Sequence, residues 1–326
     1  MPTVTLSESA KLAQDELVAG VIENIITVNR FYHVLPFDGI DGNALAYNRE
    51  NALAPVATVG VGNTDGVIGA GATSGNNQTE RQAAKDAATF TQVTSTLTTI
   101  MGDAEINGLI QATRSGDGNN QTAVQIASKS KSAGRKYQDL LINGDGTNYT
   151  FVGLIGLCAS GQTIDVGTDG AELSFEIMDE TMDAVVDKDG DVDYMTMNQR
   201  EIRGMNKLLR DLGGTSAMDA IQLPSGTTVP TYRGTPVFRN DYIPTDQVKG
   251  ASGAVTSTIF AGNLDDGARH IGIAGLTAST QAGVHIVDVG ESETKDERIW
   301  RVKWYAGLAL FSEKGLAMAP GIKVPT

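Results

Sequence analysis

The chain has 326 residues and a formal net charge of −14, with 40% apolar and 20% charged residues. This length predicts one large domain or two closely linked ones, and the apolar content argues against wholesale disorder. The negative net charge argues against a protein whose main role is to bind the phosphates of nucleic acids. A single cysteine, Cys158, excludes an internal disulfide framework and a cysteine-based zinc site.

Two further classes of protein are disfavoured. Every apolar run is far shorter than the roughly 18 residues of a membrane span. The opening sequence MPTVTLSESAKLAQDE has no basic region followed by an apolar stretch, so we expect no secretory signal. The 38 glycines exceed the usual share and indicate β-structure with long turns.

The N-terminal third predicts a helix over 7–28, a strand over 44–49 and an extended hairpin. Residues 54–77 are glycine-rich, and residues 89–101 alternate β-branched and polar side chains as a strand does. Neither hairpin strand has enough apolar surface to bury itself. Because a solitary two-stranded ribbon is marginal in water, we expect another surface to cover this hairpin.

The clearest helix is predicted over 120–143, with Asn120 as its cap and Asn143-Gly144 as its stop. Its expected buried side consists of Ala123, Ile126, Ala127, Ala133, Tyr137, Leu140 and Leu141. The other side carries four basic residues that we take as candidate assembly residues: Lys129, Lys131, Arg135 and Lys136.

The second half of the chain predicts an α/β unit followed by strands. An apolar run over 151–157 is expected to lie in a loop. A strand is predicted over 192–197. Helices are predicted on either side of it, over 173–186 and 198–212, because apolar residues recur every three or four positions in both segments. Further strands are predicted over 233–239, 257–261, 270–274, 284–289 and 298–311.

The charge is unevenly distributed. Residues 1–100 carry a net charge of −5, residues 101–150 are neutral, residues 151–250 carry −8 and residues 251–326 carry −1. Residues 165–193 contain eleven carboxylates and one basic residue, Lys188. The basic helix and this acidic segment could simply be two faces exposed to solvent. The alternative is charge complementarity between copies of the chain, which would set their register in an assembly.

The acidic run over 187–193 resembles the start of an EF-hand calcium loop. Val192 stands where that loop needs glycine, however, and Asn198 stands where it needs a bidentate glutamate. An acidic turn between helix and strand is therefore predicted, with weak calcium binding left open.

No other motif indicates catalysis. The glycine-rich stretch has neither a P-loop nor a dinucleotide-binding pattern, and no nucleophile elbow is present. The three histidines, His33, His270 and His285, are scattered in sequence, and His270 and His285 are expected in the core or at strand edges. Cys158 lies beside an apolar run, which favours a buried thiol over a reactive one. We expect no catalytic residue, no cofactor and no metal site.

The order of these pieces resembles the major capsid protein of tailed bacteriophages (Caudoviricetes), which has the Hong Kong 97-type fold. The stretches that carry the resemblance are FVGLIGL, VDYMTMNQREIRGMNKLL, YRGTPVFRNDYIP and the closing STIFAGN…IGIAGL…VDVGE…RIWRVKWYAGLALFSEKGLAMAPGI. The resemblance implies an α+β fold with an N-arm over 1–43 and an E-loop over 44–101 that lies over the adjacent subunit. It also implies a peripheral domain over 102–154 and 251–326, with the spine helix, and an axial domain over 155–250.

The implied function is that of a structural virion protein, not an enzyme. Copies would self-assemble through pentamers and hexamers into an icosahedral shell around the double-stranded DNA genome, which they would not bind sequence-specifically. Expected partners are a scaffolding protein and a portal protein, with a decoration protein left open and no membrane. Assembly is expected in the host bacterial cytoplasm.

Some members of this family join an E-loop lysine covalently to a neighbour's asparagine, and Lys85 is the one candidate here. Two alternative functions remain at this point. One is the shell of an encapsulin-type bacterial nanocompartment, and the other is a β-rich secreted carbohydrate-binding protein or hydrolase.

Overall fold

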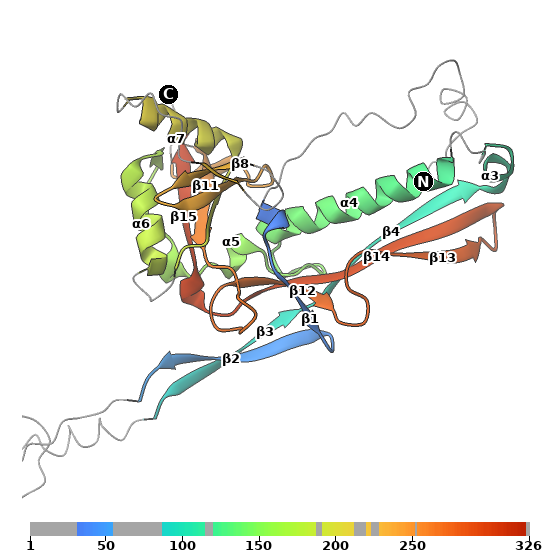
Figure 1. Cartoon of the computed structure of the whole chain (residues 1–326), viewed down its shortest axis with the longest axis horizontal. Coiled ribbons are helices and arrows are strands. Elements are labelled where there is room, and N and C mark those ends of the chain that lie inside the picture. Colours follow the sequence, from blue (N-terminus) through green and yellow to red (C-terminus); the bar gives the residue numbers. More distant parts are fainter. Residues whose placement is uncertain are drawn as a thin grey trace, which may run out of the picture. The chain divides into compact units, whose positions relative to one another are not determined.

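The computed structural model describes residues 31–54, 87–114, 120–186, 191–211, 220–222, 228–251 and 253–323. The helix predicted over 7–28 lies outside these residues. The chain divides into two compact units (Figure 1). One is Ala44–Ser95, here called the ribbon, and the other is Met1–Asn43 with Thr96–Thr326, here called the main unit.

The ribbon is a two-stranded sheet of β2 (Ala44–Ala52) and β3 (Thr89–Thr96). The pairing of these strands confirms the predicted hairpin for its described part. Most side chains on both strands are exposed, and one cross-strand hydrogen bond of 2.6 Å runs from the amide of Asn51 to the hydroxyl of Thr91. The predicted strand over 89–101 is in fact two strands, because the chain leaves β3 at Thr96 and enters the main unit with β4.

The first sheet of the main unit has five strands, ordered β1-β12-β14-β13, with β4 on the other side of β14. The strands are β1 (Phe37–Ile40), β4 (Thr98–Asn107), β12 (Ile273–Ala278), β13 (His285–Glu291) and β14 (Glu297–Leu310). The long β14 pairs antiparallel with β4 along ten residues. It pairs antiparallel with both β12 and β13 along its other edge.

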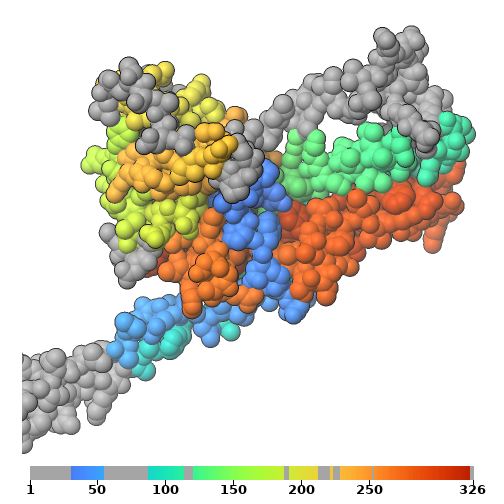
Figure 2. Space-filling model, in the orientation of Figure 1, coloured from blue at the N-terminus to red at the C-terminus, as the bar shows by residue number. Residues whose placement is uncertain are grey.

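The long helix α4 (Gln121–Asn143) covers one face of this sheet, beside the short α3 (Gly108–Arg114) (Figures 1 and 2). The predicted cap is confirmed, since the backbone N–H of Ala123 donates to the side-chain oxygen of Asn120 at 3.2 Å. Ala133 and Tyr137 are buried as predicted. The prediction was wrong for Ala123 and Ala127, which are exposed; alanine carries so little apolar area that periodicity alone does not decide its burial.

The second sheet has eight strands, ordered β5-β15-β11-β6-β9-β8-β7, with β10 beside β11. The strands are β5 (Ala171–Glu172), β6 (Tyr194–Met197), β7 (Ala220–Gln222), β8 (Thr228–Tyr232), β9 (Thr235–Arg239), β10 (Gln247–Lys249), β11 (Ala254–Gly262) and β15 (Leu316–Lys323). β11 and β15 therefore place parts of the predicted peripheral segment 251–326 in the middle of the sheet built by 155–250.

The two faces of the eight-stranded sheet are buried against different elements. Met195 and Met197 of β6 pack with side chains of α6 (Phe175–Val186) and α7 (Gln199–Asp211). Tyr194 precedes Met195 in the strand, so its side chain points to the opposite face of the sheet, where it packs with Phe238 and Phe260. Burial on both faces explains why all four residues of β6 are inaccessible to solvent.

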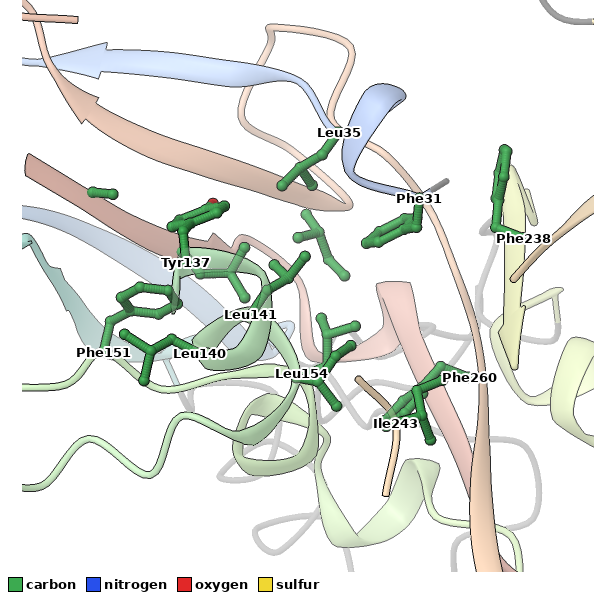
Figure 3. Packing of buried hydrophobic residues seen from close by; sticks show 14 of the residues in the cluster. Phe31, Leu35, Tyr137, Leu140, Leu141, Phe151, Leu154, Phe238, Ile243 and Phe260 are labelled. Carbon is green, nitrogen blue, oxygen red and sulfur yellow. The ribbon is translucent and has the colours of Figure 1, made fainter. Parts of the chain in front are cut away.

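A second cluster joins the two sheets of the main unit (Figure 3). It unites Phe238 and Phe260 with Tyr137 of α4 and with Phe31 of the short helix η1 (Phe31–His33). The Phe31 ring lies 4.4 Å from that of Tyr194, centroid to centroid, and is fully buried. The last part of the predicted N-arm, 31–43, is thus part of the core, and β1 extends it as a strand parallel to β12.

Three local predictions need correction. The apolar run over 151–157 is not all loop, because it contains the short helix α5 (Leu154–Leu157). The strand predicted over 270–274 begins only at Ile273, after Gly272, whose backbone φ of +100° does not suit a strand. Strand β15, which follows the helical turn η3 (Glu313–Gly315), was not predicted, because its sequence LAMAPGIK contains a proline and a glycine, which are unusual inside strands. The other helical turn is η2 (Ser160–Gln162). Across the described ranges, every helix is too short or too polar to cross a membrane.

Candidate assembly surfaces

The ribbon exposes apolar side chains that a monomer does not cover. Phe90 of β3 is 65% exposed and Leu53, just after β2, is 79% exposed. An exposed two-stranded ribbon of this kind has few internal contacts to hold it in one conformation. It is therefore the first candidate for a surface that contacts another molecule.

The five-stranded sheet has an open face opposite α4. Ile100 and Ala104 of β4 point toward the helix and are buried, whereas Met101, between them, is 57% exposed on the other side. Asp103 on this open face accepts two hydrogen bonds from Arg301, of 2.8 and 2.9 Å. These bonds hold the pKa of the Asp103 carboxyl below its usual value. The fixed ion pair and the apolar side chains make a patterned surface on which an extended segment can lie.

Strand β13 adds an apolar edge to the same sheet. Ile286, Val287 and Val289 are each at least 39% exposed. The register shift between Asp288 and Gly290 inserts a bulge there, and such bulges are common at sheet edges. Exposed apolar strand edges pair readily with other chains, so monomeric proteins usually protect them. This edge is the third place at which the subunit presents surface suited to a partner.

The four candidate assembly residues on α4 do not form one face. By helical spacing, Lys129 and Lys136 border the packed side, whereas Lys131 and Arg135 lie on the outward side. The stem of Lys129 approaches Gly102 of β4, where its charge also acts on Asp103. The ammonium of Lys136 pairs with Asp139 at 3.1 Å. The four residues are therefore divided between two sides of the helix.

A buried ion pair lies at the start of α7. The guanidinium of Arg200 donates to the carboxylate of Glu201 at 2.9 Å and to the carbonyls of Thr245 and Ile322 at 3.0 and 3.2 Å. Glu201 is 1% exposed, and burial raises the pKa of its carboxyl despite the neighbouring guanidinium. This pair was not predicted from the sequence, because adjacent Arg and Glu residues in a helix usually face solvent. The Arg200–Glu201 pair connects α7 to the end of β15, which is a structural role.

Catalytic and metal sites were expected to be absent. Among the described residues, no three His, Cys, Asp or Glu side chains gather as metal ligands would. Asp187 to Gly190 of the acidic run lie outside the described residues, while the Asp193 carboxylate accepts a 2.9 Å hydrogen bond from the backbone of Leu264. Lys85 also lies outside the described residues.

The cysteine and the histidines have structural surroundings. Cys158 is partly buried, and burial raises the pKa of its thiol to about 11, so little of the reactive thiolate is present at neutral pH. His33 is exposed. His270 is also exposed and precedes β12, and His285 opens the edge strand β13, so neither of these two lies in the core. None of them carries an arrangement typical of catalysis.

Comparison with solved structures matches the whole chain. A chain of the holo-SrpI encapsulin complex from Synechococcus elongatus PCC 7942 superposes with a TM-score of 0.68 at 15% identity, covering 100% of this chain and 98% of that one. A chain from Microbacterium phage Oxtober96 gives 0.59 at 14% identity, with 98% and 99% covered. The capsid of Myoviridae phage XM1 gives 0.58 at 11% identity, with 94% and 97% covered.

Sequence comparison adds no closer assignment, since no protein-family model and no curated protein matches the chain. The structural likeness defines the fold. The chain has the Hong Kong 97-type fold of phage capsid proteins, an α+β architecture, as the resemblance in sequence predicted. The matched structures are shell proteins, from phage capsids and from an encapsulin.

Proposed function

We propose that the chain is the major capsid protein of a tailed bacteriophage, which assembles through pentamers and hexamers into an icosahedral shell around double-stranded DNA. The observation that carries the proposal is the match over nearly the entire length of phage capsid chains. A match that includes the ribbon matters most, because the ribbon has no evident use in a monomer.

The surfaces of the subunit support this proposal. A shell protein forms heterologous contacts that close into rings, and rings close into a shell. In this scheme the ribbon is the E-loop, and it lies on the open face of a neighbour's five-stranded sheet. Phe90 on the ribbon and Met101 on the open face would then both become buried. The main unit would supply the peripheral and axial domains, and residues 1–43 the N-arm.

The remaining partners follow from the same proposal. A separate scaffolding protein, a portal protein at one vertex and, in some shells, a decoration protein would act with this chain in the host cytoplasm. No catalytic step is assigned to it. The acidic balance suits a container for DNA, because an acidic inner wall does not hold the genome by phosphate contacts.

The second candidate is an encapsulin-type shell, favoured by the TM-score of 0.68 against the Synechococcus encapsulin. The two functions differ in what the shell contains. Particles isolated from their natural source should protect double-stranded DNA from nuclease and contain a portal protein if the capsid proposal is right. Particles that contain a cargo enzyme and no protected DNA would contradict it and support the encapsulin.

A further inference from the structure

A short hairpin between α4 and α5 holds a tyrosine almost entirely in solvent. Asp145 and Val152 pair as an isolated antiparallel bridge, and the chain reverses direction between them over 147–150. Near the apex of this reversal, the side chain of Tyr149 is 96% exposed. We call residues 144–153 the Tyr149 hairpin.

The backbone of this turn does not suit a tyrosine. The N–H of Thr150 donates to the carbonyl of Thr147 at 2.9 Å. The two residues between them have positive φ angles, +49° at Asn148 and +63° at Tyr149. Such a turn is of type I′, which favours glycine at its second central position because a side chain at positive φ is strained. The exposed ring recovers nothing by packing within the subunit, and strain that persists without such compensation is typical of functional sites.

Hydrogen bonds and packing hold the hairpin in one conformation. The Asp145 carboxylate accepts from the N–H of Thr147 at 3.0 Å and from the hydroxyl of Thr150 at 2.8 Å. These bonds, with those from Thr147 first, lower the pKa of the Asp145 carboxyl to about 2, so it stays an acceptor at neutral pH. Phe151, just after the turn, is buried beside Tyr137 (Figure 3). A ring presented on such a base loses little conformational freedom when it binds.

The composition of the hairpin indicates a protein as its partner. Residues 144–153 contain no lysine or arginine, so the hairpin lacks the cations that bind nucleic-acid phosphates or anionic lipids. Its apex combines a tyrosine with asparagine and threonine. In protein-binding loops a tyrosine supplies rigid contact area, and small polar residues supply adaptable hydrogen bonds. The Tyr149 hairpin therefore fits an apolar protein surface with few charges.

A surface of this kind lies on β10 and β11 of the same chain. Val248 and Val255 stand directly opposite each other on these strands and are 70% and 49% exposed. Among the large apolar side chains in the described part of the main unit, Tyr149 and Val248 are the two most exposed. Lys249 points to the other face of the strand, where its ammonium donates to the carbonyl of Pro320 at 3.1 Å. The two valines thus form a flat apolar pair that the subunit leaves in water.

We propose that Tyr149 of one copy of this chain packs on Val248 and Val255 of a second copy. The occupant is a second copy because the chain itself carries both halves of the contact, a projecting aromatic ring and a pair of β-branched side chains, and covers neither. Aromatic and β-branched side chains pack favourably on strands, and tyrosines buried at interfaces often dominate the binding energy. The inference rests on the proposed function, since it names one contact between neighbouring subunits of the shell.

Two glycine substitutions in the same turn separate the ring from the backbone. Tyr149→Gly removes the ring and relieves the strained position, so thermal unfolding of the unassembled subunit should occur at the same or a higher temperature. The subunit concentration at which half of the protein assembles, measured by light scattering, should nevertheless rise about tenfold or more. Asn148→Gly is the matched control, because it relieves the neighbouring position and keeps the ring, and it should assemble like the parent. Val248→Asp should reproduce the loss of assembly, because it places a charge against the ring.

Photo-cross-linking identifies the partner directly. The photoreactive analogue p-benzoylphenylalanine, placed at position 149 and irradiated in assembled particles, should give a species of twice the subunit mass on a denaturing gel. Its second peptide should come from 247–256. The contact is overturned if Tyr149→Gly or Val248→Asp assembles like the parent, or if Asn148→Gly loses as much assembly as Tyr149→Gly.

The cross-link can also overturn the contact. Irradiated particles that show no cross-link, or one to another protein, to a glycan or to a different part of this chain, would contradict it. In each of these cases shells still form and the proposed function stands. A parent that never assembles would overturn the proposed function and this contact with it.

Discussion

Among single residues, Phe31 has the greatest consequence for the core. Its ring is fully buried and lies between the rings of Tyr194 and Phe238. Removing a buried aromatic ring leaves a cavity and costs about 3–5 kcal/mol. We therefore expect Phe31→Ala to lower the free energy of unfolding of the unassembled subunit by that amount in urea denaturation. Phe90→Ala is the matched control, because Phe90 is 65% exposed and its loss should change stability by less than about 0.5 kcal/mol. Equal effects of the two substitutions would contradict the assignment of 31–43 to the core.

The buried pair of Arg200 and Glu201 gives a second prediction at this scale. Arg200→Met leaves the Glu201 carboxylate buried without its cation, which should cost about 3–5 kcal/mol. The double variant Arg200→Met/Glu201→Gln removes both charges and should be less destabilised than the single one. Urea denaturation of the unassembled subunits measures both, and a double variant that is no more stable than Arg200→Met would contradict this account.

The pKa of Glu201 predicts the sign of a pH effect. Burial raises this pKa in the folded state, so the folded protein holds the proton more tightly than the unfolded chain does. The free energy that this carboxyl contributes to folding is present below the ordinary glutamate pKa and is lost as pH rises toward the raised value. The stability of the parent relative to Glu201→Gln should thus decrease with rising pH across that range. A difference that stays constant with pH would contradict the shift.

At the scale of elements, the ribbon of β2 and β3 makes the clearest prediction. Cys158 has a pKa of about 11 and is partly buried, so it contributes little background in thiol labelling. Phe90→Cys should react rapidly in the unassembled subunit. In the assembled particle its reaction should be at least about tenfold slower, because a neighbour covers the ribbon. Unchanged reactivity would mean that the ribbon stays exposed and would contradict its role as the E-loop.

Helix α4 gives a second prediction at this scale. We propose that Lys131, on its outward side, faces acidic groups of a neighbour, so Lys131→Glu should lower assembly yield and change its dependence on salt. Lys136→Glu provides a comparison on the same helix. Because Lys136 borders the packed side of the helix rather than its outward side, its reversal should have the smaller effect on assembly. Light scattering during assembly measures both, and a Lys131→Glu yield and salt dependence identical to those of the parent would count against the proposal.

The elements also show how far the sequence predicts this fold. Helices α4, α6 and α7 were predicted within a few residues because capping residues and large apolar side chains repeat at helical spacing. Strand β15 was missed, and so was the placing of β11 and β15 in the centre of the second sheet. Those pairings depend on contacts between residues far apart in the chain, such as Phe260 with Met318, which no local pattern encodes.

The assembly surfaces were less predictable than the fold. The exposed ribbon was foreseen because its strands lack apolar surface. The division of the α4 bases between two sides depends on which side of the helix meets the sheet, and the Arg200–Glu201 pair depends on carbonyls of Thr245 and Ile322 that lie far along the chain. The basic residues of α7 can be read from the sequence, but which of them are exposed could be known only once the packed side of the helix was determined.

At the scale of the whole molecule, the central claim is that the subunit is a building block whose exposed surfaces are covered by copies of itself. Electron microscopy of the purified protein, with analytical ultracentrifugation over a range of concentration and salt, tests this claim most directly. We expect closed shells of uniform diameter whose wall consists of pentamers and hexamers. A protein that remains a stable monomer under all of these conditions would contradict it.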